Sequence, residues 1–118
     1  MIISPGFVGI DVSKSSPDLF DAALGRSERI KNARAPIARL LKRWQGQGVF
    51  VLFEATGAYD QLLAKALARA GIAFARVNPL RARDFARAAG FLAKTDAVDA
   101  RMLAAMAEPL AAQSVRAP

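Results

Sequence analysis

Residues 49–53 (VFVLF) form an uninterrupted apolar run between a glycine-containing segment and a glutamate. Such a run is typical of an interior strand in a sheet that carries helices on both faces. A strand with one face in water would alternate apolar and polar residues instead. The run therefore predicts an α/β domain built around this strand.

Further strands and helices follow from the periodicity of the remaining segments. Four more segments have strand patterns bounded by turn residues: 7–12, 19–24, 27–31 and 72–77. Helical spacing of apolar residues marks four others: 37–44, 62–70, about 80–89 and about 96–107. Three strands followed by alternating helices and strands predict a mixed sheet flanked by helices. The 118 residues suit a single domain, and we expect 109–118 to form a loose tail.

The charge and composition narrow the function. Lys and Arg number 17 against 10 Asp and Glu, giving a net charge of +7 and a pI near 10.8, which favours anionic partners such as nucleic acid. Cysteine and histidine are absent, so thiolate sites, disulfides and a histidine base are excluded. No apolar run approaches the roughly 18 residues that span a bilayer, and no signal peptide is visible. We therefore expect no membrane partner and a cytoplasmic location.

Two carboxylates stand at the ends of apolar strands. Asp11 lies in the first strand, where a lone charge is costly, and Glu54 follows the run 49–53 directly. If these strands are parallel neighbours, both residues lie at the carboxyl edge of the sheet, where ligand sites of open α/β sheets form. Each has a simpler interpretation: Asp11 as a turn residue, and Glu54 as the partner of an arginine.

A second acidic pair, Asp96 and Asp99, opens the last predicted helix with a spacing of i, i+3. The pair could cap the helix and complement its dipole. Alternatively, it could join Asp11 and Glu54 in one site. Four converging carboxylates suit Mg²⁺ or Mn²⁺, and such sites cleave phosphodiesters without histidine or cysteine.

Basic residues precede and follow this second pair in the sequence, and another, Lys14, follows the first strand. The candidates for phosphate contacts with a nucleic acid are Lys14, Arg81, Arg83, Arg87, Lys94 and Arg101. A different basic set, Arg34, Arg39, Lys42 and Arg43, fits a solvated helix face. Residues 9–14 (GIDVSK) also permit a nucleotide-phosphate site of the actin-like ATPase or sugar-kinase type, although they lack the further glycines of a phosphate loop.

Four segments in order resemble the DEDD transposases, namely the insertion sequence 110 family and the Piv-type invertases. These segments are 9–14 (GIDVSK), 53–59 (FEATGAY), 77–79 (VNP) and 94–100 (KTDAVDA). The resemblance implies a ribonuclease H-like (RuvC-like) fold with Asp11, Glu54, Asp96 and Asp99 as catalytic ligands of Mg²⁺ or Mn²⁺. It also implies DNA strand cleavage and exchange during transposition or inversion.

The same resemblance bears on the wider protein. Family members carry a C-terminal domain with a nucleophilic serine, and some use a structured guide RNA. Nothing in residues 1–118 corresponds to that domain, and Ser114 is a lone serine in the expected tail. We therefore expect residues 1–118 to be the N-terminal catalytic domain of a longer, self-associating recombinase. A non-catalytic fragment that binds DNA or RNA by charge is the alternative.

Overall fold

The run 49–53 lies almost wholly in β4, an interior strand of a five-stranded sheet. A computed structural model describes residues 6–12, 16–55, 60–90 and 99–116, with side chains up to residue 110. The elements are β1 (Phe7–Asp11), β2 (Asp18–Asp21), β3 (Arg26–Arg29), α1 (Arg34–Trp44), β4 (Phe50–Glu54), α2 (Gln61–Ala70), β5 (Ala73–Val77), α3 (Pro79–Ala88) and α4 (Ala100–Arg116). The strand order is β3-β2-β1-β4-β5.

The strand directions confirm the mixed sheet. β1 is parallel to β4 and β4 is parallel to β5, whereas β2 is antiparallel to both β1 and β3. Connections through α1 and α2 produce the parallel pairs, because a parallel neighbour requires a crossover. A turn at residues 22–25 joins the antiparallel strands β2 and β3.

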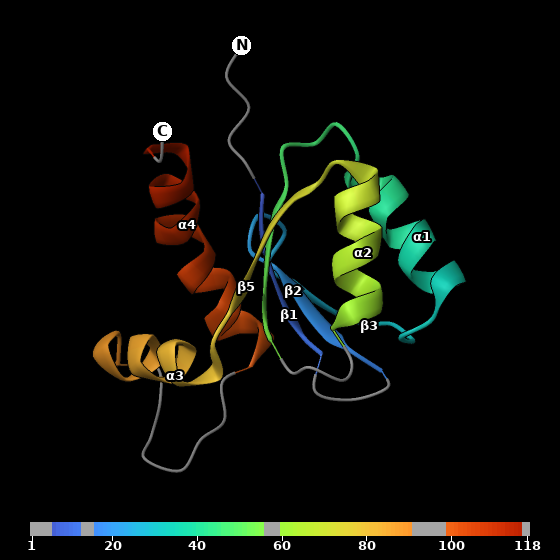
Figure 1. Cartoon of the computed structure of the whole chain (residues 1–118). Helices are drawn as coiled ribbons and strands as arrows, with labels where there is room; N and C mark the ends of the chain where they lie inside the picture. Colours follow the sequence, from blue (N-terminus) through green and yellow to red (C-terminus); the bar gives the residue numbers. More distant parts are fainter. Residues whose placement is uncertain (1–5, 13–15, 56–59, 91–98, 117–118) are drawn as a thin grey trace.

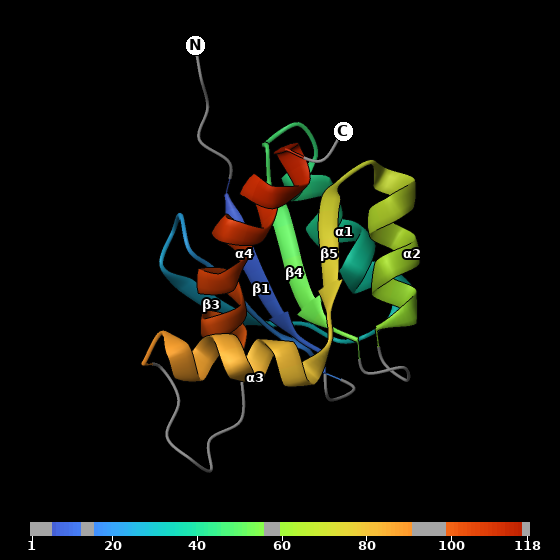
Figure 2. The same ribbon diagram turned by 60° about the vertical axis from the view of Figure 1, so that its left-hand side comes forward.

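Helices cover both faces of the sheet, as the apolar run requires. α1 and α2 lie on one face and α4 on the other, with α3 beside the lower end of α4 (Figures 1 and 2). Alternate residues of β4 divide between the two cores: Val51 and Phe53 pack towards α1 and α2, and Phe50 and Leu52 towards α4. β4 is therefore buried on both sides, as predicted.

Gly9 of β1 is the point where α4 meets the sheet. A Cβ atom at this position would collide with the backbone oxygen of Ala100 and the backbone nitrogen of Ala104, and would lie 2.8 Å from Cβ of Leu103. The helix backbone can approach this closely only because glycine has no side chain. The first turn of α4, from Ala100 to Ala104, therefore packs directly against β1 at Gly9.

Several predicted boundaries were wrong; α1, for example, begins at Arg34 rather than at residue 37. β2 ends at Asp21 rather than at residue 24, because Oδ1 of Asp21 accepts the backbone N–H groups of Ala23 and Leu24 and turns the chain. The last helix begins at Ala100, not near residue 96. It also continues through Pro109 to Arg116, so the expected loose tail from residue 109 is largely helical.

Candidate active site

Asp11 and Glu54 end neighbouring parallel strands. Ile10 of β1 is in register with Phe53 of β4, so the next residue on each strand is one of the two carboxylates. This confirms the predicted pairing of the two strands and places both side chains at the carboxyl edge of the sheet. That edge is where ligand sites of open α/β sheets form.

The electrostatics show that the two carboxylates affect each other. The pKa of Glu54 is raised, first because the side chain is partly buried and second because of the negative charge of Asp11. Arg83 of α3 acts in the opposite direction and lowers that pKa. Glu54 forms no ion pair with any described residue, which disfavours its interpretation as the partner of an arginine.

We expect Glu54→Gln to stabilise the metal-free chain at neutral pH. Since the folded-state pKa of Glu54 is raised, the folded protein holds more protons than the unfolded chain, and stability falls as the pH rises through that pKa. Because glutamine does not titrate, the stability of the variant should decrease less than that of wild type as the pH rises. Urea unfolding midpoints from about pH 4 to about pH 8 check the expectation. The exposed Glu108→Gln serves as the control, and an unchanged pH profile in Glu54→Gln would contradict the prediction.

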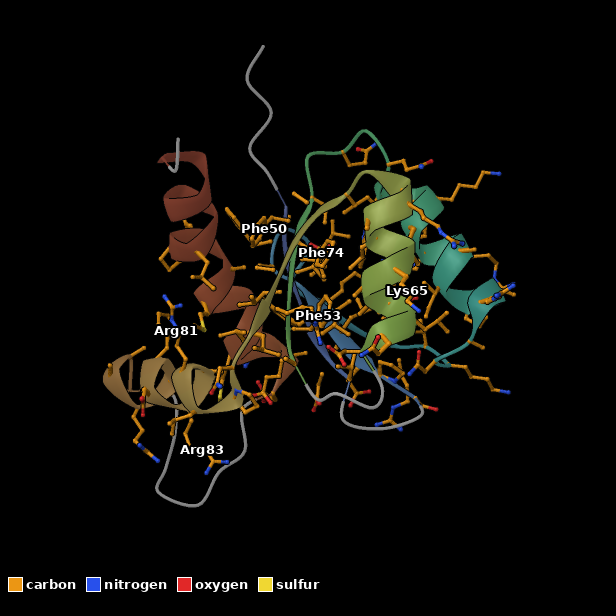
Figure 3. All side chains as sticks on the ribbon, viewed as in Figure 1. Phe50, Phe53, Lys65, Phe74, Arg81 and Arg83 are labelled. Atoms are coloured by element: carbon orange, nitrogen blue, oxygen red, sulfur yellow. The ribbon has the colours of Figure 1, made fainter. Side chains whose placement is uncertain are left out.

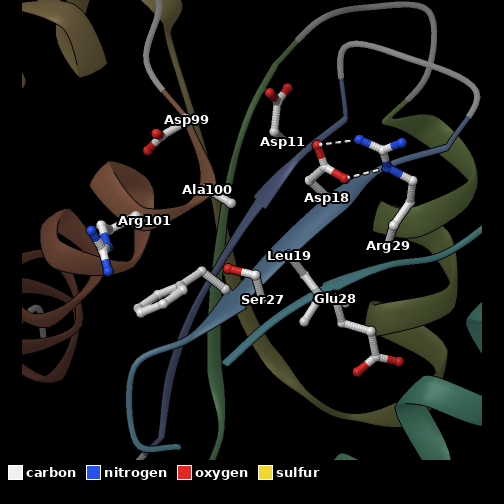
Figure 4. A pocket seen from close by; sticks show the side chains of 10 residues that line it. Asp11, Asp18, Leu19, Ser27, Glu28, Arg29, Asp99, Ala100 and Arg101 are labelled. Atoms are coloured by element: carbon white, nitrogen blue, oxygen red, sulfur yellow. Dashed lines mark hydrogen bonds and ion pairs between the residues drawn. The ribbon is translucent and has the colours of Figure 1, made fainter. Parts of the chain in front are cut away.

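Asp99 lies just before α4 and caps it. Its Oδ1 accepts the N–H of Met102 at 3.0 Å, and its backbone oxygen accepts the N–H of Leu103. The capping interpretation of Asp99 is therefore confirmed, but the expected i, i+3 pair on one helix face is not, because the helix starts at Ala100. Asp11 and Asp99 nevertheless line one open pocket of about 640 Å³ (Figure 4).

Three of the candidate residues, Lys14, Lys94 and Asp96, lie outside the described residues. Within the described part of the chain, no group of three or more acidic side chains is arranged to hold a metal ion. The structure thus brings Asp11 next to Glu54, and Asp99 lines the pocket that Asp11 also lines. Convergence of all four carboxylates stays a prediction.

Asp18 and Glu28 also line this pocket, and neither was a predicted site residue; Asp18 is the one nearest to Asp11 in the sheet. It is the antiparallel partner of Asp11 in the β1–β2 register and forms an ion pair of 2.7 Å with Arg29 of β3 (Figure 4). Its proximity to Asp11 depends on the register of the antiparallel strands β1 and β2. A period-two alignment of residues 7–12 against 18–21 would have been the only sequence signal.

The candidate cations divide between two places. Arg81 and Arg83 project to different sides of α3, with Arg81 towards α4 (Figure 3). Arg87 is exposed and pairs with Asp84 at 3.4 Å. Arg101, in the first turn of α4, lines the pocket that contains Asp11 and Asp99. Its guanidinium carbon lies 5.3 Å from the centre of the Phe20 ring. These four could reach a polyanion at the carboxyl edge, and their phosphate contacts stay a prediction.

Arg76 of β5 and Asp60, the residue before α2, form an ion pair in which only the carboxylate is buried. Asp60 is fully buried at the position before α2, and Arg76 of β5 contacts its Oδ2 at 2.6 and 2.7 Å. Although Asp60 stands at the N-cap position of α2, its side chain makes no capping bond. Since Phe53 is in register with Arg76, the pair ties the chain following Glu54 to β5.

The nucleotide-phosphate alternative loses its main support. That interpretation requires open space at Gly9 for a phosphate, whereas the backbone of α4 occupies the space. Gly9 therefore serves helix packing in this fold.

A sheet of order β3-β2-β1-β4-β5, flanked by helices and with acids at the ends of β1 and β4, defines a ribonuclease H-like domain. A sequence model of a protein family, the DEDD transposases of the insertion sequence 110 type, matches residues 8–118; the family is described as 'Transposase'. The chain belongs to this transposase family, whose substrate class is DNA. No curated protein gives a significant match. No helix within the described residues is long and apolar enough to cross a membrane.

Proposed function

We propose that this chain is the metal-dependent catalytic domain that cleaves and exchanges DNA strands when a mobile element transposes or inverts. The observation that carries the proposal is the side-by-side position of Asp11 and Glu54 at the ends of β1 and β4. Burial and mutual repulsion make this pair unfavourable without a cation, as the raised pKa of Glu54 indicates.

The donor chemistry fits Mg²⁺ or Mn²⁺, which prefer carboxylate oxygens. Asp11 and Glu54 would hold the ion from the sheet, and Asp99, with Asp96, would approach from the start of α4. When bound, the ion supplies Lewis-acid stabilisation of a phosphodiester and activation of an attacking oxygen. The capping bond from Met102 orients the Asp99 carboxylate, and Gly9 allows the helix that carries it to sit close to Asp11.

The surrounding cations would position the DNA. Arg83 already acts electrostatically on Glu54, so a phosphate near this arginine would lie close to the carboxylate pair. Arg81, Arg87 and Arg101 would neutralise further phosphates, and Lys14 and Lys94 complete the proposed set. Use of a structured guide RNA and self-association of a longer recombinase belong to the same proposal.

Metal titration tests the site. At a Mn²⁺ concentration about ten times its Kd, we expect wild type to gain about 1.4 kcal/mol in unfolding free energy. Asp11→Asn and Glu54→Gln should gain little, whereas Glu108→Gln should respond like wild type. A labelled DNA duplex should be cut by wild type with Mg²⁺ and remain intact with Asp11→Asn. Equal stabilisation of wild type and Asp11→Asn would refute the carboxylate site.

The same experiment separates the non-catalytic alternative. A chain that binds duplex DNA in a salt-dependent way, yet gains no stability from Mn²⁺ and cuts no strand, would be a charge-driven nucleic-acid binder. In that case the pair Asp11 and Glu54 would have no metal to hold.

We also expect Phe20 to position Arg101 for DNA. A ring beneath a guanidinium at an exposed site contributes about 0.5–1 kcal/mol, so Phe20→Leu should weaken duplex binding by about twofold to fivefold. Phe20→Trp should preserve affinity, since tryptophan is the best partner for a cation. Arg101→Ala should reduce the slope of log affinity against log salt by about 1.

The coupling between the two residues checks this role. In an Arg101→Ala background, Phe20→Leu should have no further effect on DNA affinity, as measured by fluorescence anisotropy at several salt concentrations. Additive losses from the two substitutions would show that Phe20 acts independently of Arg101.

A further inference from the structure

α1 and α2 lie side by side on the face of the sheet opposite α4 (Figure 1), and residues of both helices line a groove. Its volume is about 880 Å³. Apolar side chains from both helices make its floor, chiefly Ile37 and Leu41 of α1 and Leu62 and Ala66 of α2. Ile37 and Leu41 are buried in the core, whereas Leu62 and Ala66 are partly open to solvent. The groove is therefore a surface with an apolar bottom.

The charges around this groove are all of one sign. Its walls carry four exposed cations, Arg34 and Lys42 from α1 and Lys65 and Arg69 from α2. Neither helix contains an acidic residue. None of the four cations has an ion pair with a described residue, in contrast to Arg43 of α1, which pairs with Glu28 at 3.1 Å. Lys65 projects outward from α2 (Figure 3).

We propose that this groove binds an amphipathic α-helix of a partner protein, with an apolar stripe flanked by Glu or Asp. Helix-in-groove recognition places apolar side chains at i, i+3, i+4 and i+7 against an apolar floor. Flanking carboxylates would meet cations on both walls, which gives the complementarity that sets specificity and speeds association. The proposal does not depend on the proposed catalytic role of Asp11 and Glu54 at the carboxyl edge of the sheet.

Two other occupants fit the groove less well. A nucleic-acid backbone would match the cations but would leave the aliphatic floor without a partner. A second copy of the chain would need an acid-flanked apolar helix, and the four described helices together contain only Asp84 and Glu108 as acids. An acidic amphipathic helix satisfies both the floor and the walls.

The test uses a synthetic helical peptide of about 18 residues with a leucine stripe and glutamates on both sides. Binding to the full 118-residue chain is measured by fluorescence anisotropy, and the site is mapped by NMR shifts of backbone amides. We expect shifts along α1 and α2. The double variant Lys42→Glu/Lys65→Glu should weaken binding at least tenfold, about 1.4 kcal/mol. Arg39→Glu, also exposed on α1 but outside the groove, is the matched control and should stay within about twofold of wild type.

Several results would overturn the proposal. A peptide whose glutamates are replaced by lysines should not bind; equal binding would show that charge plays no part. No binding of the acidic peptide at about millimolar concentration, or an unaffected double variant, would refute the groove as its site. Shifts along α1 and α2 caused by duplex DNA or RNA and not by the peptide would assign the face to nucleic acid. Self-association of wild type that Lys42→Glu/Lys65→Glu abolishes would assign it to a second copy.

Discussion

Gly9→Ala should lower the free energy of unfolding by about 3 kcal/mol, at the upper end of the usual cost of overpacking. The new methyl group would overlap the backbone of α4 at Ala100 and Ala104, and backbone atoms cannot rotate away as a flexible side chain can. The helix must therefore move off β1. Because Asp99 caps that helix, the displacement should also weaken the proposed metal site. Chemical denaturation and Mn²⁺ titration measure the two effects.

Gly6→Ala is the matched control for this substitution. Its Cβ would lie 3.6 Å from Cγ2 of Val49, an ordinary van der Waals contact just before the same strand. This variant should differ little from wild type in stability and in its response to Mn²⁺. If Gly9→Ala were as stable as Gly6→Ala, the close contact between β1 and α4 would be disproved.

Arg76→Ala should also cost about 3 kcal/mol of unfolding free energy. Asp60 has no exposed surface, so removing Arg76 leaves a buried carboxylate without its ion-pair partner, and breaking such a pair is strongly destabilising. Asp60→Asn should cost less, because the Arg76 side chain is 40% exposed and water can solvate it. Urea unfolding curves of the two variants provide the comparison.

An exposed ion pair offers the control for this asymmetry. Arg87 and Asp84 are both largely exposed on α3, and exposed pairs contribute little to stability. Arg87→Ala should therefore unfold close to wild type. A loss in Arg76→Ala no larger than that in Arg87→Ala would mean that Asp60 is not held by Arg76 in solution.

Much of the sheet could be predicted because its signals are local. The apolar run 49–53 predicts a strand covered on both faces, and the periodic segments after it predict the crossover helices. The sequence predicted that Asp11 and Glu54 would lie together if β1 and β4 were parallel neighbours, and the structure shows that they are. The length of α4 was missed, since the helix predicted to end near residue 107 continues through Pro109 to Arg116.

The rest of the site depends on contacts between distant segments. Asp18 reaches Asp11 through a hairpin register, and Arg76 reaches Asp60 across a sheet edge. Gly9 looked like part of a phosphate-binding segment, yet it is the place where α4 lies on the sheet. No local pattern encodes such contacts, because each depends on how two elements pack.

The sequence alone determines the order of strands and helices and the excess of positive charge. It also determines the absence of histidine and cysteine and the presence of two carboxylates at strand ends. Tertiary structure alone decided that Asp99 and Asp11 line one pocket, that Asp60 is buried against Arg76, and that α1 and α2 share a basic groove. Periodicity records which face of an element is buried. Only packing determines which distant residue meets that face.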